Sequence, residues 1–501
     1  MTVIVLLILV SAAMLAPGLV VGPSLDAAVF SHIGGRLLDG VAPYVGAWDH
    51  KPPGIYLASA ASQAVLGWLG PWTADWLLSG AATVGLGAAV AATLGRLRVS
   101  GWPRTLGAVG ATVLAGHYLL ALGGGLAEPL GAVAVAWALV LALGPPSGFR
   151  AAGIGALAGV SILFSVQLAP AVLLVLALAL VLRPSGARWP GTVAMGLGVV
   201  GPPAGAVAWL AAIGVLPEAI TAIVTYATAY RASSGEYGGI LGAPVASWSV
   251  LASLFLIAPA LLGAAELRRT GQPRRGVMIA SLVWIGGSLA LFVVQGRFYA
   301  HYVIPLAIPL GILAGIGLDR VRESLGRVAG AVSRAVIVLP LVVTLLVSAT
   351  AGVLSGAMVL APVADQSGRM RAVAELLDDL PDGSLLVWGN QPHLYDLAGR
   401  DPATAYSYFY PLTTPGFSTA AMVGEAAREL AADPPAVVVD AGSSAPGQPG
   451  FLPLLIDRPI TTDGRDLDLL DPLRTFVADH YDLTATVAGW PIYVLRAASV
   501  E

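Results

Sequence analysis

One segment of the sequence gathers several side chains that can bind phosphate or move a proton. The stretch GAWDHKPPGIY, residues 46–56, places Asp49, His50 and Lys51 in a row, and Lys51 is the only lysine among the 26 Lys and Arg residues of the chain. An ammonium group is a compact and movable point charge, whereas a guanidinium grips phosphate oxygens in a bidentate fork. Lys51 is therefore a candidate phosphate ligand.

Similar residue types recur in other polar segments that separate long apolar runs. These segments are residues 22–56, 123–130, 227–239 and 295–305. The candidates in them are Asp26, Tyr44, Asp49, His50 and Lys51 in the first, Glu128 in the second, Arg231 in the third, and Arg297, His301 and Tyr302 in the fourth. We expect these acids, bases and aromatic side chains to converge on one face of a membrane.

Such a face suits a substrate that is half lipid and half polar. Lys51 and Arg297 would hold a phosphate at the headgroup level, and Asp26 would accept the proton of an incoming hydroxyl as a general base. A Lys or Arg at a membrane boundary is, however, more often an anchor whose charged end reaches the interface. Asp26, Asp49 and Glu128 leave open a carboxylate site for Mg²⁺ or Mn²⁺.

Composition gives the class of protein. The chain has 501 residues, of which 57% are hydrophobic and 11% charged, against about 25% charged in soluble domains. Its mean hydropathy is +0.81. We therefore predict an α-helical protein that crosses the membrane many times. It has no cysteine, which excludes disulfides, thiol nucleophiles and Cys-ligated metals, and its net charge of −3 gives no sign of a nucleic-acid partner, so we expect none.

Apolar runs predict about eleven membrane spans. They lie near residues 2–21, 74–95, 105–122, 129–144, 151–164, 166–182, 189–213, 246–263, 277–294, 303–318 and 335–358. A further run, 54–70, is at the lower length limit for a span. If it lies along the surface and the N-terminus is cytoplasmic, most arginines fall in inner loops, and the outer loops hold only Arg36, Lys51, Arg231 and Arg297. The alternative has 54–70 crossing and 151–182 forming one long helix.

The composition becomes that of a soluble domain after residue 360. Residues 367–383 and 419–435 read as amphipathic helices, each followed by a buried strand at 384–390 and 436–442. Residues 476–497 read as the end of a helix and a pair of strands. We predict a transmembrane domain over 1–360 and an α/β domain over 361–501, on the outer side of the cell membrane.

The order of these motifs resembles the GT-C superfamily of integral-membrane glycosyltransferases, in the family-39-like branch of protein O-mannosyltransferases and lipid A aminoarabinose transferases. That group has an acid after the first span, a Lys-Pro-Pro at the end of the first outer loop, a second acid in the next outer loop and a late loop with Arg and aromatics. Here these are Asp26, Lys51-Pro52-Pro53, Glu128 and GRFYAHYVIP, residues 296–305. The sequence departs from many relatives in Asp26-Ala27, where they have Asp-Glu, and in His50, where they have an acid.

The resemblance implies a function and roles. Such enzymes transfer a sugar from a polyprenyl-phosphate carrier to a lipid, polysaccharide or protein acceptor on the outer face, with inversion at the anomeric carbon. It implies that Lys51, Arg297, His301 and Arg231 surround the donor phosphate, that His50, Tyr44 and Tyr302 contact substrate, and that Asp26 activates the acceptor, with Asp49 and Glu128 as further catalytic acids. Some members of the group use a divalent cation and others do not.

Two other classes of function remain open from the residues. A transporter or lipid flippase is the first, although its path would be marked by ionisable residues inside the spans, which are nearly absent here. A non-catalytic assembly protein, whose outer domain binds a partner, is the second.

Overall fold

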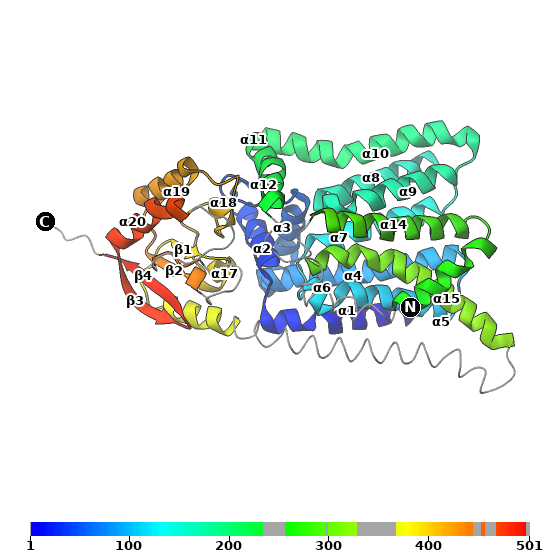
Figure 1. Ribbon diagram of the computed structural model, residues 1–501, viewed down its shortest axis with the longest axis horizontal. Coiled ribbons are helices and arrows are strands. Elements are labelled where there is room, and N and C mark those ends of the chain that lie inside the picture. The colour runs from blue at the N-terminus through cyan, green and yellow to red at the C-terminus, as the bar shows by residue number, and fades with distance from the viewer. Residues whose placement is uncertain are drawn as a thin grey trace.

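The computed structural model describes residues 2–233, 256–295, 299–327, 367–443, 452–455 and 467–496. It has two parts, a long helical bundle and a smaller domain with a β-sheet at one end of it (Figure 1). The predicted boundary at 360 and the predicted span 335–358 lie outside the described residues, as do Arg297 and residues 246–255.

Helices make up the described part of the bundle. They are α1 (Thr2–Val21), α2 (Leu25–Leu38), α3 (Gly54–Leu66), α4 (Pro71–Arg96), α5 (Trp102–Gly116), α6 (Tyr118–Ala121), α7 (Ala127–Ala142), α8 (Gly148–Phe164), α9 (Ala169–Val181), α10 (Ser185–Ala212), α11 (Leu216–Ile220), α12 (Ala227–Ala232), α14 (Arg274–Gln295) and α15 (Ala307–Arg327). Residues 256–265 are also helical, and a 3₁₀ helix, η6 (Ala300–Leu306), precedes α15. Among the described residues, five helical segments are long and apolar enough to cross a membrane: 2–21, 71–96, 188–212, 274–295 and 300–325.

The structure shows where two long apolar stretches of the sequence are interrupted. The run 105–122 is divided at His117, which caps α6 by accepting from the Leu119 backbone N–H. The run 151–182 forms two helices, α8 and α9, joined as a hairpin. The end of α9 returns to the start of α8, where Arg183 Nη2 donates to the Ser147 carbonyl at 3.5 Å. The two predicted segments are therefore separate, and the single long helix of the alternative topology does not form.

Helices α2 and α3 lie across the end of the bundle, between it and the C-terminal domain (Figure 1). The start of α3 touches the end of α8, since a Cβ on Gly54 would contact the backbone of Leu163. The end of α3 leads through Gly67–Leu69 into α4, whose Trp72 Nε1 donates to the Gly18 carbonyl near the end of α1. Both ends of α3 thus lie at the same end of the bundle, as expected for a surface helix at 54–70.

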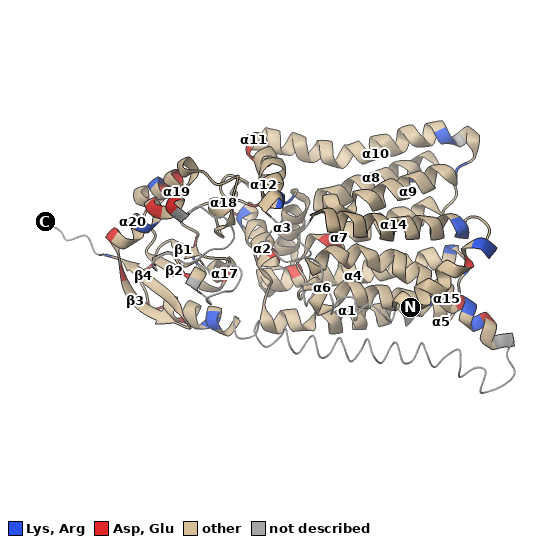
Figure 2. Ribbon diagram, in the orientation of Figure 1, with Lys and Arg blue, Asp and Glu red and all other residues tan. Residues whose placement is uncertain are grey.

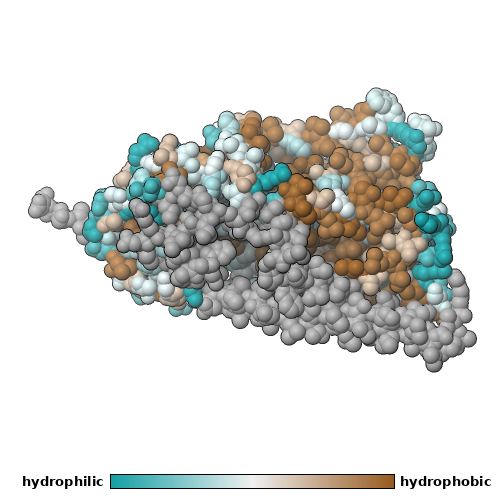
Figure 3. Space-filling view, viewed as in Figure 1, coloured by the Kyte–Doolittle hydropathy of each residue, from teal (hydrophilic) through white to brown (hydrophobic). Residues whose placement is uncertain are grey.

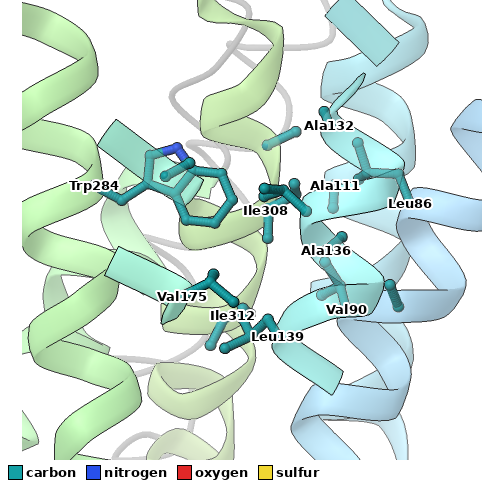
Figure 4. Close-up of a cluster of buried hydrophobic side chains, with 14 of the residues drawn as sticks. Leu86, Val90, Ala111, Ala132, Ala136, Leu139, Val175, Trp284, Ile308 and Ile312 are labelled. Atoms are coloured by element: carbon teal, nitrogen blue, oxygen red, sulfur yellow. The ribbon is translucent and has the colours of Figure 1, made fainter. Parts of the chain in front are cut away.

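The bundle is held together by close packing of apolar side chains. Figure 4 shows part of the core, in which Leu86, Val90, Leu139, Trp284 and Ile308 meet from different helices. Small residues let helices approach, since a Cβ on Gly155 of α8 would collide with the backbone of α10. This use of small residues is general in membranes, where close packing takes over from the hydrophobic effect between helices.

In the described part of the C-terminal domain, four strands form a sheet of order β1-β2-β4-β3. The parallel pair β1 (Leu385–Trp388) and β2 (Val437–Asp440) is joined through α19 (Ala420–Ala432), and β3 (Tyr481–Val487) and β4 (Trp490–Leu495) form an antiparallel hairpin. Strands β1 and β2 are buried along their whole length, which explains why their residues are apolar except for Asp440 at the end of β2. Helix 367–377 and α20 (Asp471–His480) pack beside the sheet.

Charge and hydropathy divide the molecule along its long axis. The side of the bundle is largely apolar, and hydrophilic residues gather at its end and on the C-terminal domain (Figure 3). Basic residues cluster at the bundle end opposite the C-terminal domain (Figure 2). This is the distribution of a protein whose bundle is surrounded by lipid.

Candidate functional site

The site lies at the end of the bundle next to the C-terminal domain, where α2, the loop 39–53, α7 and η6 meet. Asp26 lies in the first turn of α2, which begins after Ser24, whose Oγ accepts from the Ala27 N–H at 3.4 Å. Helix starts favour negative charge, because free N–H groups and the helix dipole point there. The Asp26 side chain keeps 40% of its accessible surface. It is therefore an acid that another molecule can reach.

Two tyrosines fix the backbone of Lys51. Tyr44 Oη donates to the Lys51 carbonyl at 3.0 Å, and the Lys51 N–H donates to Tyr56 Oη at 3.1 Å. Tyr44 has a left-handed backbone with φ of 66°, which a non-glycine residue keeps only where its surroundings hold it. Here its ring is buried against Tyr56. Tyr44 thus supports the loop from inside.

Lys51 points toward the start of α7. Its Nζ lies 3.7 Å from Glu128 Oε1 and 5.9 Å from the centre of the Tyr302 ring. The Glu128 side chain is 1% exposed, and its Oε1 accepts no hydrogen bond. Burial alone would lower the pKa of Lys51, but the charges around it, with Glu128 the largest and Tyr302, Asp26 and Asp49 after it, together raise this pKa above its usual value. Lys51 is therefore firmly charged.

His301 and Tyr302 close the other side of the site. His301 Nε2 lies 3.8 Å from Asp26 Oδ2, and its ring is 4% exposed. It stacks on Tyr299 with ring centres 5.5 Å apart and meets Tyr302 edge to face at 4.6 Å. The structure thus brings together five predicted site residues: Asp26, Lys51, Glu128, His301 and Tyr302.

Asp49 is committed to other contacts. It accepts from Tyr408 Oη at 2.6 Å and Tyr56 Oη at 2.7 Å, and His50 Nδ1 lies 3.0 Å from its Oδ1. Burial tends to raise the pKa of Asp49, but His50 and the two hydroxyl donors together hold it below the ordinary range. Because Tyr408 belongs to the C-terminal domain, Asp49 joins that domain to the Lys51 loop.

His50 belongs to an aromatic cluster rather than to the cation site. Its ring lies 5.0 Å from Tyr226 and 5.7 Å from Tyr230, and the latter hydroxyl contacts that of Tyr299 at 2.6 Å. Trp48 packs edge to face on Tyr226 at 4.8 Å. The cluster connects the first loop with η3 (Thr221–Tyr226), α12 and the segment before η6.

The C-terminal domain also docks on α2. Asp396 Oδ1 lies 3.4 Å from His32 Nδ1, and Arg36 Nη1 donates to Asp401 Oδ1 at 2.5 Å. The Trp48 N–H donates to the Ala405 carbonyl at 2.9 Å. These contacts place the domain against the loop that carries Lys51.

Comparison with known proteins bears on the fold. No family model and no curated protein sequence matches the chain. The crystal structure of ArnT from Cupriavidus metallidurans bound to undecaprenyl phosphate matches with a TM-score of 0.58 at 15% identity, over 99% of this chain and 98% of ArnT. The apo structure of the same protein matches with a TM-score of 0.54 at 16% identity, over 94% and 93%. The chain has the GT-C fold. The resemblance of the sequence predicted this fold correctly.

Two predicted phosphate ligands, Arg231 and Arg297, remain to be considered. Arg231 is exposed on α12, and no contact among the described residues joins it to the Lys51 cluster. Arg297 lies outside the described residues. Within the described ranges no three His, Asp or Glu side chains gather to hold a metal ion. We therefore derive no step through a metal.

Several residues of the site were not predicted from the sequence. Tyr56 and Tyr408 hold Asp49, and Tyr299 stacks on His301. Tyr56 follows the Lys-Pro-Pro motif after Gly54 and Ile55, and this nearness was a usable signal. Tyr408 gave none, because its partner is distant in the chain and buried aromatic residues are common in any core.

Proposed function

We propose that this protein is a membrane glycosyltransferase that moves a sugar from a polyprenyl-phosphate donor to an acceptor outside the cell. The fold supports a transferase of this class, and ArnT, which shares the fold, has been crystallised with undecaprenyl phosphate. The observation that carries the proposal is the buried pair of Lys51 and Glu128 beside the accessible Asp26. A firmly held cation and an open carboxylate are what phosphate binding and proton removal require.

The geometry supports the following roles. Lys51 would hold the donor phosphate, with Tyr302 beside its ammonium group, and Arg297, which precedes η6 in the sequence, is proposed as a further cation. Asp26 would take the proton of the acceptor hydroxyl, and its contact with His301 would keep it oriented. The acceptor oxygen then forms a bond to the anomeric carbon while the bond to the phosphate oxygen breaks, and polyprenyl phosphate leaves with the electron pair. Attack opposite the leaving group inverts the anomeric carbon.

The other acids take different parts in this proposal. Glu128 would keep Lys51 charged and oriented, and Asp49 would position the Lys51 loop against the C-terminal domain. Tyr44 would support that loop, and His50 would pack in the aromatic cluster. A contact of His50 or Tyr44 with substrate, which the resemblance implied, is not needed.

The orientation follows from charge. Basic residues gather at the bundle end away from the C-terminal domain (Figure 2), and cytoplasmic loops carry an excess of Lys and Arg. We propose that this end faces the cytoplasm together with the N-terminus, so that the candidate site and the C-terminal domain face outward in the cell membrane.

The direct test is transfer by the purified full chain. The protein is given labelled polyprenyl-phosphate sugars and membrane, wall or protein acceptor fractions, and label in the acceptor is measured alongside the Lys51→Ala variant. We expect transfer with at least one donor and a loss in the variant. Lipid scrambling in proteoliposomes without transfer from any donor would instead favour a flippase.

A further inference from the structure

The bundle end opposite the candidate site carries a second group of cations. Helices α4, α7 and α9 end there, and α8, α10 and α14 begin there. Each helix end carries about half an elementary charge, negative where a helix ends and positive where one begins, so these partial charges nearly cancel. The electrostatics of this region are therefore set by its side chains.

The arginines of this end differ in their acidic partners. Arg274 and Arg322 share the carboxylate of Asp319, which lies 3.5 Å from the first and 2.7 Å from the second. Those around α7 and α9 have no acidic partner in the part of the chain that the structure describes. They are Arg96, Arg150, Arg183 and Arg188.

Arg183 lines a cavity of about 170 Å³. The other lining residues are 141–146, Leu182 and Pro273. Arg183 is 7% exposed, its Nη2 donates to the Ser147 carbonyl at 3.5 Å, and its buried Nε has no acceptor. A buried donor left without a partner is unfavourable, more so when it is charged. Because Arg183 lines the cavity, an acceptor placed there would lie beside its guanidinium group.

Two further guanidinium groups lie beside the same cavity at Gly144. A Cβ on Gly144 would collide with Arg150 Nη1 and lie 3.0 Å from Arg96 Nη1, so the two cations are neighbours. Arginines at helix ends often donate to free carbonyls, and Arg96 Nη1 does so to Leu143 at 3.3 Å. Arg150 Nη1, in contrast, is buried and has no acceptor among the described residues. An anion beside these two guanidinium groups would offset the repulsion between their positive charges and would accept the unused hydrogen bond.

We propose that Arg183, Arg150 and Arg96 form a binding site for a phosphate group at the end of α7 and α9. Guanidinium forks suit phosphate oxygens, and a cavity of this size exceeds the roughly 30 Å³ that one water occupies in liquid. The site lies at the ends of membrane helices, where lipid headgroups are found, and Arg183 is the one charged residue among the described residues that line the cavity. It is separate from the candidate active site and does not depend on the proposed function.

The source of the phosphate is either an anionic lipid or the free ion, and two measurements separate them. Native mass spectrometry of the full chain in detergent gives retention of phosphatidylglycerol against phosphatidylcholine. Thermal unfolding in inorganic phosphate against chloride at equal ionic strength reports the free ion. We expect Arg183→Gln to weaken binding roughly 10- to 150-fold in whichever measurement responds.

Arg275→Gln is the matched control, because Arg275 is exposed on α14 at the same end of the bundle and loses the same charge. It should bind as the wild type does. Arg150→Gln is the second variant if Arg183→Gln does not fold, and it should also weaken binding. The proposal would be overturned if the Arg150 variant and every folded Arg183 variant bound phosphate as well as the wild type does. It would also be overturned if Arg275→Gln lost as much binding as those variants. No response of the wild type to either phosphate source would overturn it too.

Discussion

Lys51 and Glu128 face each other with Nζ and Oε1 3.7 Å apart, one from the loop 39–53 and the other from the first turn of α7. The separation is longer than the roughly 2.7–2.9 Å of a charge-assisted hydrogen bond. The two charges therefore stabilise each other while Lys51 keeps its hydrogen-bond donors for a third group. A phosphate oxygen could occupy that position without breaking a bond within the protein.

Removing the ammonium group should weaken donor binding. In Lys51→Ala we expect affinity for polyprenyl phosphate to fall roughly 10- to 150-fold, because a charge-assisted contact contributes about 1.5–3 kcal/mol. Lys51→Arg should recover part of this loss, since the charge stays but its shape and reach change. Titration calorimetry or native mass spectrometry of the purified variants measures the effect.

Folding has to be separated from binding in this experiment. Lys51→Ala leaves Glu128 buried without a cation, which destabilises the fold by itself. The double variant Lys51→Met/Glu128→Gln removes both charges and should fold more stably than Lys51→Ala, yet still bind weakly. Donor affinity of the wild type in this double variant would contradict the assignment of Lys51.

Glu128→Gln should make donor binding sensitive to alkaline pH. Glu128 is the largest of the charges that raise the pKa of Lys51 against its burial, so removing it should lower this pKa. The wild type should bind donor equally at about pH 7 and pH 9.5, whereas the variant should lose affinity as Lys51 loses its proton over this range. Affinity measured across this range tests the idea, and a flat profile for the variant would refute it. Asp26→Asn, whose charge affects Lys51 less, is the control.

Much of the fold could be predicted because it depends on local pattern. The amphipathic run at 419–435 gave α19, which begins after Thr419, whose Oγ1 accepts from the Met422 N–H at 3.3 Å. The runs at 384–390 and 436–442 predicted buried strands, and these are β1 and β2, which the structure pairs in parallel. Such signals need only a few neighbouring residues.

The candidate site was predicted in part, and the limit has a physical cause. Asp26, Lys51 and Glu128 were chosen by type and position, and the structure brings them together. The partners of Asp49 could not be anticipated, because Tyr408 lies 359 positions away and reaches it only through docking of the C-terminal domain. The charge and position of Asp49 can be read from the sequence, and only tertiary contacts show which groups its oxygens bind.

Asp49 should stabilise the fold in a pH-dependent way. Its pKa is lower in the folded protein than its ordinary 3.8, so the folded state binds fewer protons there. Its contribution is therefore full above about pH 4 and is lost as the pH falls through the folded-state pKa. We expect Asp49→Asn to lose about 1.5–3 kcal/mol at pH 7, because the Tyr56 and Tyr408 hydroxyls no longer donate to a charged acceptor.

Thermal unfolding of wild type and variant at pH 7 and near pH 3 measures this difference, which should shrink in acid. Asp39→Asn is the control, because Asp39 ends α2 with a side chain that is 64% exposed. It should change stability little at either pH. A constant difference between the wild type and Asp49→Asn at both pH values would show that the carboxylate charge has no such role.

The last prediction separates proton removal from donor binding at Asp26. Asp26→Asn keeps nearly the same volume and leaves Lys51 and Glu128 in place, so donor affinity should change little. Transfer should fall by about two orders of magnitude or more, as expected for loss of a general base. Single-turnover transfer with saturating donor measures this, with Asp39→Asn as the control from the other end of the same helix. Because Asp49 is held by Tyr56 and Tyr408, undiminished transfer in Asp26→Asn would move the base to Glu128, the remaining acid beside Lys51.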